Sequence, residues 1–450
     1  MIEIIVPLAL LFIMALVKKI PKIGGDIRVA LLVAAVSSAI ISGLNLGETA
    51  LAFVDGIDRL SWVIMLSLFG SLYAESQAKL GAIDTTLNSL RAAFGNSPKG
   101  LIVAIFITLI LAGSLLGDAI AAATVIGFLV INSLTELKLK PEQIGMIILL
   151  GASIGSIMPP ITQGVFLSAS LVGVDPSPVI KIAYVTVTIG AILAILESFR
   201  FVRGKKMPKE LIPEQKVFQI LKERWKTLIP LLVLIAIVLA NTLFDYNIFT
   251  EISIFAFILE PLKEIRIVQG ITFQVVSAII IAFLVSFLFP AVRKDTKGVF
   301  KNGLGKVNQT VQIQICAGVM VGVFYASGLI DKVALMTEGL GSSMVKLGGA
   351  LSMVVVGMLT GSQTTSQSVI VTFLGPILEK MEVAPELIAL GASHIAAAGQ
   401  NMPPVGLTAF VICGLIGGIL NTKVDPLKVM MLALPNSLYF LLIGLIVWFV

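Results

Sequence analysis

The stretch Gly155-Ser156-Ile157-Met158-Pro159-Pro160 interrupts a long apolar segment, and Gly399-Gln400-Asn401-Met402-Pro403-Pro404 interrupts a second one 244 residues later. Consecutive prolines remove backbone hydrogen bonds that lipid cannot replace. Such breaks are tolerated inside a membrane only where the backbone is buried in protein or lines a polar cavity. The two stretches therefore predict a pair of broken helices.

Composition indicates a membrane protein. The chain of 450 residues is 57% hydrophobic and 13% charged, with a mean hydropathy of +1.03. Soluble domains carry about 25% charged residues. Apolar runs long enough to span a bilayer recur along the chain, so we predict an all-α polytopic membrane protein. The first run, 2–17, lacks a basic leader and a small-residue cleavage site, and we interpret it as a retained helix.

Further pairs of residues repeat at the spacing of 244. They are Gly117 and Gly361, Pro141 and Pro385, Gly155 and Gly399, and Phe166 and Phe410. Interrupted segments at corresponding places in two halves are the sequence feature that best indicates a transporter's binding site. We therefore interpret the chain as two copies of one unit.

Apolar segments give five predicted spans in each half. They cover 2–17, 27–44, 60–77, 143–172 and 181–201, and then 228–244, 268–289, 307–327, 386–420 and 427–449. An amphipathic stretch (79–96 or 331–347) and a helix-loop-helix (100–135 or 349–381) lie between the third and fourth spans. We expect each helix-loop-helix to be too short to cross twice. It is predicted to be a re-entrant hairpin, followed by a broken helix (143–172 or 386–420).

The charges of the connecting segments predict orientation. Segments 18–28 and 293–306 are basic, whereas 45–58 and 245–251 are acidic. Cytoplasmic loops favour Lys and Arg, so five spans per half make the second copy inverted relative to the first. The predicted organisation is a first repeat (1–203), a basic cytoplasmic linker (204–226) and a second repeat (227–450), with 246–266 as an external insert that carries an interfacial helix.

The first hairpin carries a carboxylate in the sequence Gly113-Ser114-Leu115-Leu116-Gly117-Asp118. An ionisable residue inside an apolar segment is costly and usually faces a cavity or a cation. Asp118 is thus a candidate cation ligand or proton acceptor. The alternative is a carboxylate that caps the second helix of the hairpin. The two roles are compatible.

The second hairpin carries the run Thr360-Gly361-Ser362-Gln363-Thr364-Thr365-Ser366-Gln367-Ser368. Hydroxyl and amide oxygens with loop carbonyls suit a hard cation such as Na⁺. Exposed helix N-termini suit an anionic carboxylate. Interhelical hydrogen bonding is the alternative for such a run.

The hairpins and breaks together give one predicted site. The candidate cation-binding residues are Ser114, Gly117, Asp118, Gly155, Gly361, Ser362, Thr365, Gly399 and Asn401. The candidate substrate-binding residues are Ser156, Pro159, Pro160, Thr162, Thr364, Ser366, Pro403, Pro404 and Thr408. Gln163 also follows a break and could touch substrate.

Other reactive residues are few. His394 is the single histidine, and it is interpreted either as a proton-coupling group or as a packing residue beside Ser393. Cys316 and Cys413 stand singly in apolar segments, so neither a disulfide nor a resident metal site is expected. No phosphate-binding loop, nucleophile triad or metal-ligand cluster is present in the sequence, so we predict neither an enzyme nor a resident cofactor. Basic residues cluster between spans, which argues against nucleic-acid binding.

At these motifs the chain resembles the large membrane subunit of TRAP transporters, within the ion-transporter superfamily of elevator carriers. Gly113-Ser114 with Asp118-Ala119 is similar to that family's hairpin signature, and 159–176 and 402–418 are similar to its two Pro-Pro segments. Leu115 and Gly361-Ser362 depart from the family pattern. The resemblance implies Na⁺-coupled uptake of an organic acid, a small four-helix membrane subunit and an extracytoplasmic substrate-binding protein.

We accordingly predict a secondary transporter in the cytoplasmic membrane that takes up a small organic anion, a dicarboxylate or related acid, with Na⁺ by an elevator mechanism. The alternative is a stand-alone proton-coupled organic-acid carrier or a cation/proton antiporter of the same superfamily. A channel or an intramembrane enzyme is disfavoured, because an enzyme needs more acid, base or metal groups than one Asp and one His. The substrate leaves no signature in the sequence.

Overall fold

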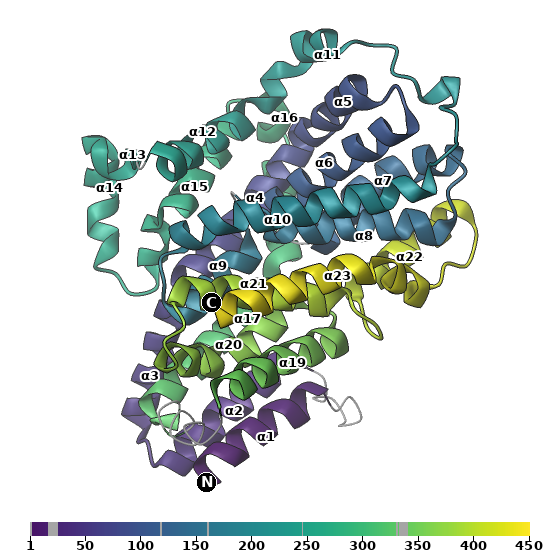
Figure 1. Cartoon of the computed structure of the whole chain (residues 1–450). Helices are drawn as coiled ribbons and strands as arrows, with labels where there is room; N and C mark the ends of the chain where they lie inside the picture. The colour runs from purple at the N-terminus through teal and green to yellow at the C-terminus, as the bar shows by residue number, and fades with distance from the viewer. Residues whose placement is uncertain are drawn as a thin grey trace.

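The fold is all-helical (Figure 1). The computed structural model describes residues 2–16, 26–117, 119–159, 162–244, 246–329, 332 and 341–450. Within these ranges there is no strand, and six helices are long and apolar enough to cross a membrane (α6, α7, α10, α17, α19 and α23). The prediction of a polytopic all-α membrane protein is confirmed.

A first helix group packs around the long helix α17 (Thr296–Ala326). α17 contacts α2, α3 and α4, while α15 packs on α4 and α12. Gly56, Gly318 and Gly322 let α3 and α17 approach closely, because a Cβ on Gly56 would lie 2.0 Å from the carbonyl oxygen of Gly318. The other members are α1 (Ile2–Leu16), α2 (Ile27–Ser42), α3 (Leu46–Arg59), α4 (Ser61–Leu80), α12 (Ile229–Phe244) and α15 (Gln274–Ser286).

A second helix group holds both predicted hairpins and both breaks. Its members are α6 (Pro98–Leu116), α7 (Ala119–Glu136), α8 (Pro141–Ile157), α9 (Gln163–Val172), α10 (Pro176–Ser198), α19 (Ser342–Thr360), α20 (Gln363–Lys380), α21 (Pro385–Asn401), α22 (Leu407–Leu420) and α23 (Pro426–Phe449). In Figure 1 the yellow α23 lies beside α21, and α8 from the first half of the chain also packs on α23. The N-terminal α1 lies at the opposite end of the molecule from α11. α5 (Ala82–Phe94) packs on α6 and α4.

Helix bounds recur at the spacing of 244 residues. α6, α7 and α8 begin and end at positions that correspond to the bounds of α19, α20 and α21. Local chemistry explains the match. Gly117 and Gly361 end their helices at φ of 63° and 65°, a left-handed conformation that favours glycine. Pro141 and Pro385 each occupy a first helical turn, where proline is well tolerated.

Apolar side chains cover outward faces of the second helix group. On α10, Val185 is 59% exposed and Leu196 55% exposed. On α23, Leu442 and Ile446 are exposed on one face. Exposed apolar surface of this extent is unfavourable in water, so these faces fit contact with lipid.

Several predicted boundaries were wrong. The acidic connection 45–58 is mostly α3, because Asn45 and Glu48 form a capping box that starts a helix. The basic segment 293–306 is mostly helical, covering the end of α16 (Pro290–Arg293) and the start of α17. Asp295 caps α17 and receives a hydrogen bond from Lys79, which lowers the pKa of this carboxyl. Charged residues in 45–58 and 293–306 predicted loops, but some of these residues cap helices that occupy the segments instead.

The hairpin arms are longer than expected. α6 and α19 have 19 residues each, and α7 and α20 have 18. At about 1.5 Å per residue each arm is nearly as long as the hydrocarbon core is thick. The expectation that the hairpins are too short to cross twice was wrong. α6 starts at Pro98, where Ser97 caps the helix, and α19 starts at Ser342, so both hairpins begin earlier than their predicted starts at 100 and 349.

The remaining segments are short helices. The expected insert 246–266 contains α13 (Ile248–Glu251) and α14 (Ser253–Lys263), followed by η4 (Val268–Thr272). η1 (Phe199–Phe201) follows α10, and the expected linker contains η2 (Lys209–Leu211), α11 (Val217–Arg224) and the start of η3 (Trp225–Leu228). Most of the amphipathic stretch expected at 331–347 lies outside the described residues.

Candidate functional site

The two breaks have similar geometry. Met158 and Met402 leave the helical conformation at ψ of 120° and 145°. In the first break, the Thr162 hydroxyl accepts a hydrogen bond from the Val165 amide and donates one to the Ser156 carbonyl, over 3.2 Å each. Thr162 therefore caps α9 and links the start of α9 to the last turn of α8 across the break.

Each break is also tied to its own hairpin. The Ser114 hydroxyl on α6 donates a hydrogen bond to the Met158 carbonyl over 2.9 Å. In the second copy, the Val405 amide donates to the carbonyl of Met358 over 3.1 Å. Ser114 and Met358 occupy equivalent positions, 244 residues apart. The first arm of each hairpin, α6 or α19, therefore bonds to the break of its own copy from the same position.

Glycines bring each hairpin arm against its broken helix. A Cβ on Gly113 would lie 2.8 Å from the Cα of Gly155, and one on Gly357 would lie 3.0 Å from the Cα of Gly399. Gly155 and Gly399 remain helical, and their carbonyls accept hydrogen bonds from Met158 and Met402. These glycines serve close packing in the described fold.

Hydrogen bonds join the two copies. The Ser153 hydroxyl on α8 donates to Asn401 Oδ1 on α21 over 2.9 Å. Gln363, the first residue of α20, donates through Nε2 to the Ser156 hydroxyl over 3.0 Å. The tip of the second hairpin thus reaches the break of the first copy, and both breaks meet in one polar centre.

A cavity of about 510 Å³ opens beside this centre. Four helices present their first residues to it: Ala119 of α7, Gln163 of α9, Ser362 to Thr365 at the start of α20, and Leu407 with Thr408 of α22. Helix N-termini carry partial positive charge and free backbone amides. Among the described residues that line the cavity, Lys306 is the only charged one. The cavity is therefore suited to an anion.

The cavity brings together part of the predicted site. The predicted residues that line it are Gly117, Gly361, Ser362, Thr364, Thr365 and Thr408, with Gln163 beside them. The predicted residues that lie elsewhere in the described structure are Ser114, Gly155, Ser156, Pro159, Thr162, Ser366, Gly399, Asn401, Pro403 and Pro404. Asp118 and Pro160 lie outside the described residues.

His394 does not line this cavity. Its Nε2 lies 2.9 Å from the Thr186 hydroxyl on α10, and its Nδ1 lies 3.0 Å from the Ser393 hydroxyl. The ring packs edge-on against Phe440 of α23 and is fully buried. His394 thus joins α10, α21 and α23.

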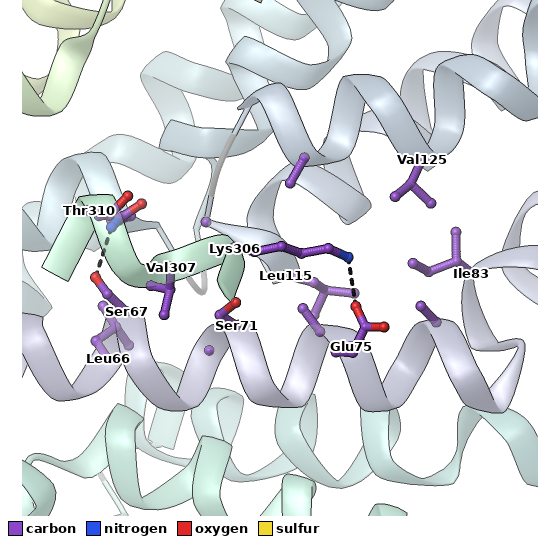
Figure 2. A pocket seen from close by; sticks show the side chains of 16 residues that line it. Leu66, Ser67, Ser71, Glu75, Ile83, Leu115, Val125, Lys306, Val307 and Thr310 are labelled. Carbon is purple, nitrogen blue, oxygen red and sulfur yellow. Dashed lines mark hydrogen bonds and ion pairs between the residues drawn. The ribbon is translucent and has the colours of Figure 1, made fainter. Parts of the chain in front are cut away.

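A second, smaller cavity of about 60 Å³ adjoins the large one and was missed by the sequence interpretation (Figure 2). Ser67, Ser71 and Glu75 line one side of it from α4, and Lys306 crosses it to reach Glu75. Three polar residues at intervals of four in the apolar segment 60–77 were the available signal, because such spacing puts them on one helix face.

Broken helices that surround a polar cavity in a polytopic membrane fold define a membrane transporter. The sequence matches the family described as "DctM: Tripartite ATP-independent periplasmic transporter, DctM component" over residues 8–450. The chain belongs to this family, and the resemblance inferred from the Pro-Pro and hairpin motifs is confirmed. It is a large membrane component of a secondary transporter of the TRAP type.

The fold is similar to that of a solved transporter. The structure described as "Crystal structure of the Alcanivorax borkumensis YdaH transporter reveals an unusual topology" superposes with a TM-score of 0.62. The match covers 90% of this chain and 89% of that chain at 14% sequence identity, so it concerns the fold alone. A search of curated proteins found no match.

Proposed function

We propose that the chain takes up a small organic anion, a dicarboxylate or related carboxylic acid, together with Na⁺ across the cytoplasmic membrane. The observation that carries this proposal is the 510 Å³ cavity, where four helix N-termini and Lys306 converge. Backbone amides at helix starts bind carboxylates well because their dipoles are fixed in place. A cavity of this size accommodates a small-molecule ligand.

The proposed architecture is two inverted repeats, 1–203 and 227–450, joined by the basic linker 204–226. The matching bounds of α6–α8 and α19–α21 support the repeat. The alternation of basic and acidic segments along the chain supports the inversion, although the structure places 45–58 in α3 and most of 293–306 in α16 and α17. The hairpins are proposed to be re-entrant. Gly117 lies against Gln163 at the start of α9, and Gly361 lies against Leu407 at the start of α22. Each tip therefore meets a break rather than the end of a spanning helix.

The second helix group is the proposed moving part of an elevator. It contains both tips and both breaks, and hydrogen bonds such as Ser153–Asn401 and Gln363–Ser156 hold it together. Direct side-chain hydrogen bonds that reach the first group include Gln163 to Ser67 and Ser170 to the Arg59 carbonyl. Few directional contacts at a boundary favour motion of one body against another.

Na⁺ is the proposed coupling ion, and it is carried as cargo. Hydroxyl and carbonyl oxygens at the tips are the ligand type that a hard cation prefers. Ser362 and Thr365 lie at the second tip and Gly117 at the first. The wider cation set proposed from the motifs adds Ser114, Asp118, Gly155, Gly361, Gly399 and Asn401. The substrate set proposed from the motifs is Ser156, Pro159, Pro160, Thr162, Thr364, Ser366, Pro403, Pro404 and Thr408. Of the residues in these two lists, Gly361, Thr364 and Thr408 line the large cavity.

Family membership supports the proposed partners. A TRAP-type system combines the large component with a small membrane subunit and an extracytoplasmic substrate-binding protein, and we propose the same assembly for this chain. The exposed apolar faces of α10 and α23 are available to lipid or to the small subunit.

The proposal is tested with the full chain, and its partners where they co-purify, in liposomes. Uptake of radiolabelled acetate, lactate, succinate, malate and citrate is measured under an inward Na⁺ gradient, under an inward proton gradient, and with neither. We expect Na⁺-dependent uptake of at least one acid. Uptake driven by protons alone would favour the proton-coupled alternative, and no uptake of any acid under either gradient would contradict the proposal.

A matched pair of cap variants tests the site. The Ser362 hydroxyl accepts a hydrogen bond from the Thr365 amide at the proposed site, and Asp425 caps α23 in the same way at Leu427, away from the cavity. Ser362→Ala should raise the Na⁺ concentration for half-maximal uptake by roughly tenfold. Asp425→Ala removes a similar cap and should leave it within about twofold. Equal effects would contradict the assignment of Ser362.

A further inference from the structure

An ion pair lies at the small cavity, and one of its two residues also lines the large cavity. Lys306 Nζ on α17 lies 2.6 Å from Glu75 Oε2 on α4, and Asn302 Nδ2 donates to Glu75 Oε1 over 3.1 Å. The Glu75 side chain is only 7% exposed, whereas the Lys306 side chain is 54% exposed. The carboxylate is therefore fixed in the protein, and the ammonium group lies on a long, flexible and accessible side chain.

Lys306 borders both cavities. Of the residues that the structure describes, four line both the small and the large cavity, namely Gly117, Gln163, Lys306 and Thr310. Figure 2 shows the Lys306 side chain extended across the small cavity toward Glu75. Rotation about the bonds of this side chain would carry the ammonium group toward the large cavity, without movement of a helix.

The Glu75 carboxylate would keep a partner after such a rotation. Asn302 still donates to its Oε1 atom. The small cavity of about 60 Å³ has room for water, which could hydrate Oε2 in place of the ammonium. A buried carboxylate without any partner would be costly, and this arrangement avoids that state.

We propose that Lys306 is a specificity-determining residue of the proposed transport site, which exchanges Glu75 for a negatively charged group of the bound substrate. The inference rests on the proposed function. In the empty site Glu75 neutralises Lys306 and holds it at the cavity wall. In the loaded site Lys306 faces a second anionic group of a substrate whose first carboxylate occupies the helix N-termini that line the large cavity.

The role differs from that of a structural ion pair in one measurable way. If the pair only stabilises the fold, loss of either partner should damage binding alike. If Glu75 competes with substrate for Lys306, then Glu75→Gln frees Lys306 and tightens binding. Glu75→Gln keeps the side-chain shape and still offers a carbonyl oxygen to Asn302.

The test is ligand-dependent thermal stabilisation of the purified full chain at constant Na⁺ and ionic strength, with sodium acetate as the single-charge probe and sodium succinate, malate and citrate as the multiply charged probes. The variants are Lys306→Gln, Lys306→Arg, Glu75→Gln and the double variant Glu75→Gln/Lys306→Gln. The matched control is Lys301→Gln, because Lys301 is an exposed lysine on the same helix that lines neither cavity.

For the multiply charged acid that stabilises the wild type best, Lys306→Gln should raise the apparent dissociation constant roughly tenfold to a hundredfold. Binding of acetate should change by less than about threefold, and Lys306→Arg should retain most of the affinity. Glu75→Gln should tighten binding severalfold, and Lys301→Gln should match the wild type. Should Lys306→Gln alone fail to fold, the double variant supplies the same comparison without a buried unpaired carboxylate.

Three results would overturn the inference while leaving the proposed function intact: unchanged binding in Lys306→Gln, equal loss for acetate and the multiply charged acids, or weakened binding in Glu75→Gln. If no acid stabilises the wild type, the proposed function fails and the inference fails with it. If acetate alone stabilises the wild type, anion binding stands and the second anionic contact is wrong.

Discussion

Gln163 Nε2 donates a hydrogen bond to the Ser67 hydroxyl over 2.8 Å, and this bond links the first turn of α9 to the middle of α4. Ser67 also accepts a hydrogen bond from Gln314 Nε2 over 2.8 Å, but Gln314 belongs to the same helix group as Ser67. A displacement of the second helix group along α4 breaks the first bond and keeps the second. Ser67 is thus a contact point between the proposed moving and static parts.

Ser67→Ala should change the rate of transport more than the affinity for substrate. The lost hydrogen bond is worth about 1 kcal/mol in the state described here, so escape from this state should become up to about fivefold faster. Transport rate and dissociation constant are measured on the same preparation. Ser71→Ala is the matched control, because the Ser71 hydroxyl donates to the Gly303 carbonyl inside the first group. Equal effects of both substitutions would assign Ser67 a stabilising role only.

Gly113→Ala should destabilise the protein. Its new Cβ would lie 2.8 Å from the Gly155 Cα and from the Ala152 carbonyl oxygen, so α6 and α8 would have to separate. Overpacking of this kind costs about 1–3 kcal/mol. We expect a fall of several degrees in the thermal midpoint of the purified protein. In Gly414→Ala the added Cβ meets no atom within 4 Å, so that variant should be unchanged or slightly stabilised. A stable Gly113→Ala would contradict the close packing.

His394→Gln should retain uptake with an unchanged dependence on external pH. The imidazole bonds to Thr186 and Ser393, and none of these three residues lines the anion cavity, so loss of the ring removes packing and hydrogen bonds. The stability of the variant should fall by about 1–3 kcal/mol, as judged by thermal unfolding. Thr186→Val, which removes one partner of the ring, should behave similarly. A folded variant that loses coupled uptake would instead support the proton-coupled alternative.

Ser114→Ala should weaken coupling by loosening the first break. Its hydroxyl donates to the Met158 carbonyl, whereas the equivalent Met358 in the second copy accepts a hydrogen bond from the Val405 amide through its backbone carbonyl. We expect the Na⁺ concentration for half-maximal uptake to rise roughly fivefold to tenfold. The comparison is Ser352→Ala on α19, whose hydroxyl donates only locally to the Gly348 carbonyl on an exposed face. Identical Na⁺ curves for the two variants would remove Ser114 from the site.

The sequence predicts the repeated core well because its signals are local. Pro141 and Pro385 fix helix starts, and Gly117 and Gly361 fix helix ends, so each boundary depends on a few adjacent residues. Hydropathy is less reliable for the arm lengths, because polar caps such as Ser97 extend a helix beyond its apolar run.

The sequence predicts some of the residues that line the site but not the ion pair beside them. Motif spacing identifies Ser362, Thr365 and Thr408, which lie on one copy of the repeat. The Glu75–Lys306 pair joins residues 231 positions apart on helices that no shared motif connects. Lys306 also belongs to a basic segment that positive charge bias alone explains, so its contact with a cavity becomes visible only after α4 and α17 are packed together.

The equal spacing of the two copies has a practical consequence for engineering. From Pro98 to Gln163 and from Ser342 to Leu407, the helix starts of the two copies keep the spacing of 244 residues. Beyond these positions the copies differ, because α22 is four residues longer than α9 and α23 starts six residues later than that spacing requires. The two copies therefore agree in length up to the starts of α9 and α22, and they differ from there to the starts of α10 and α23. A tag or fluorescent label inserted at the exposed Lys423 should therefore be tolerated better than one inserted at Gly361, where the backbone lies against Leu407.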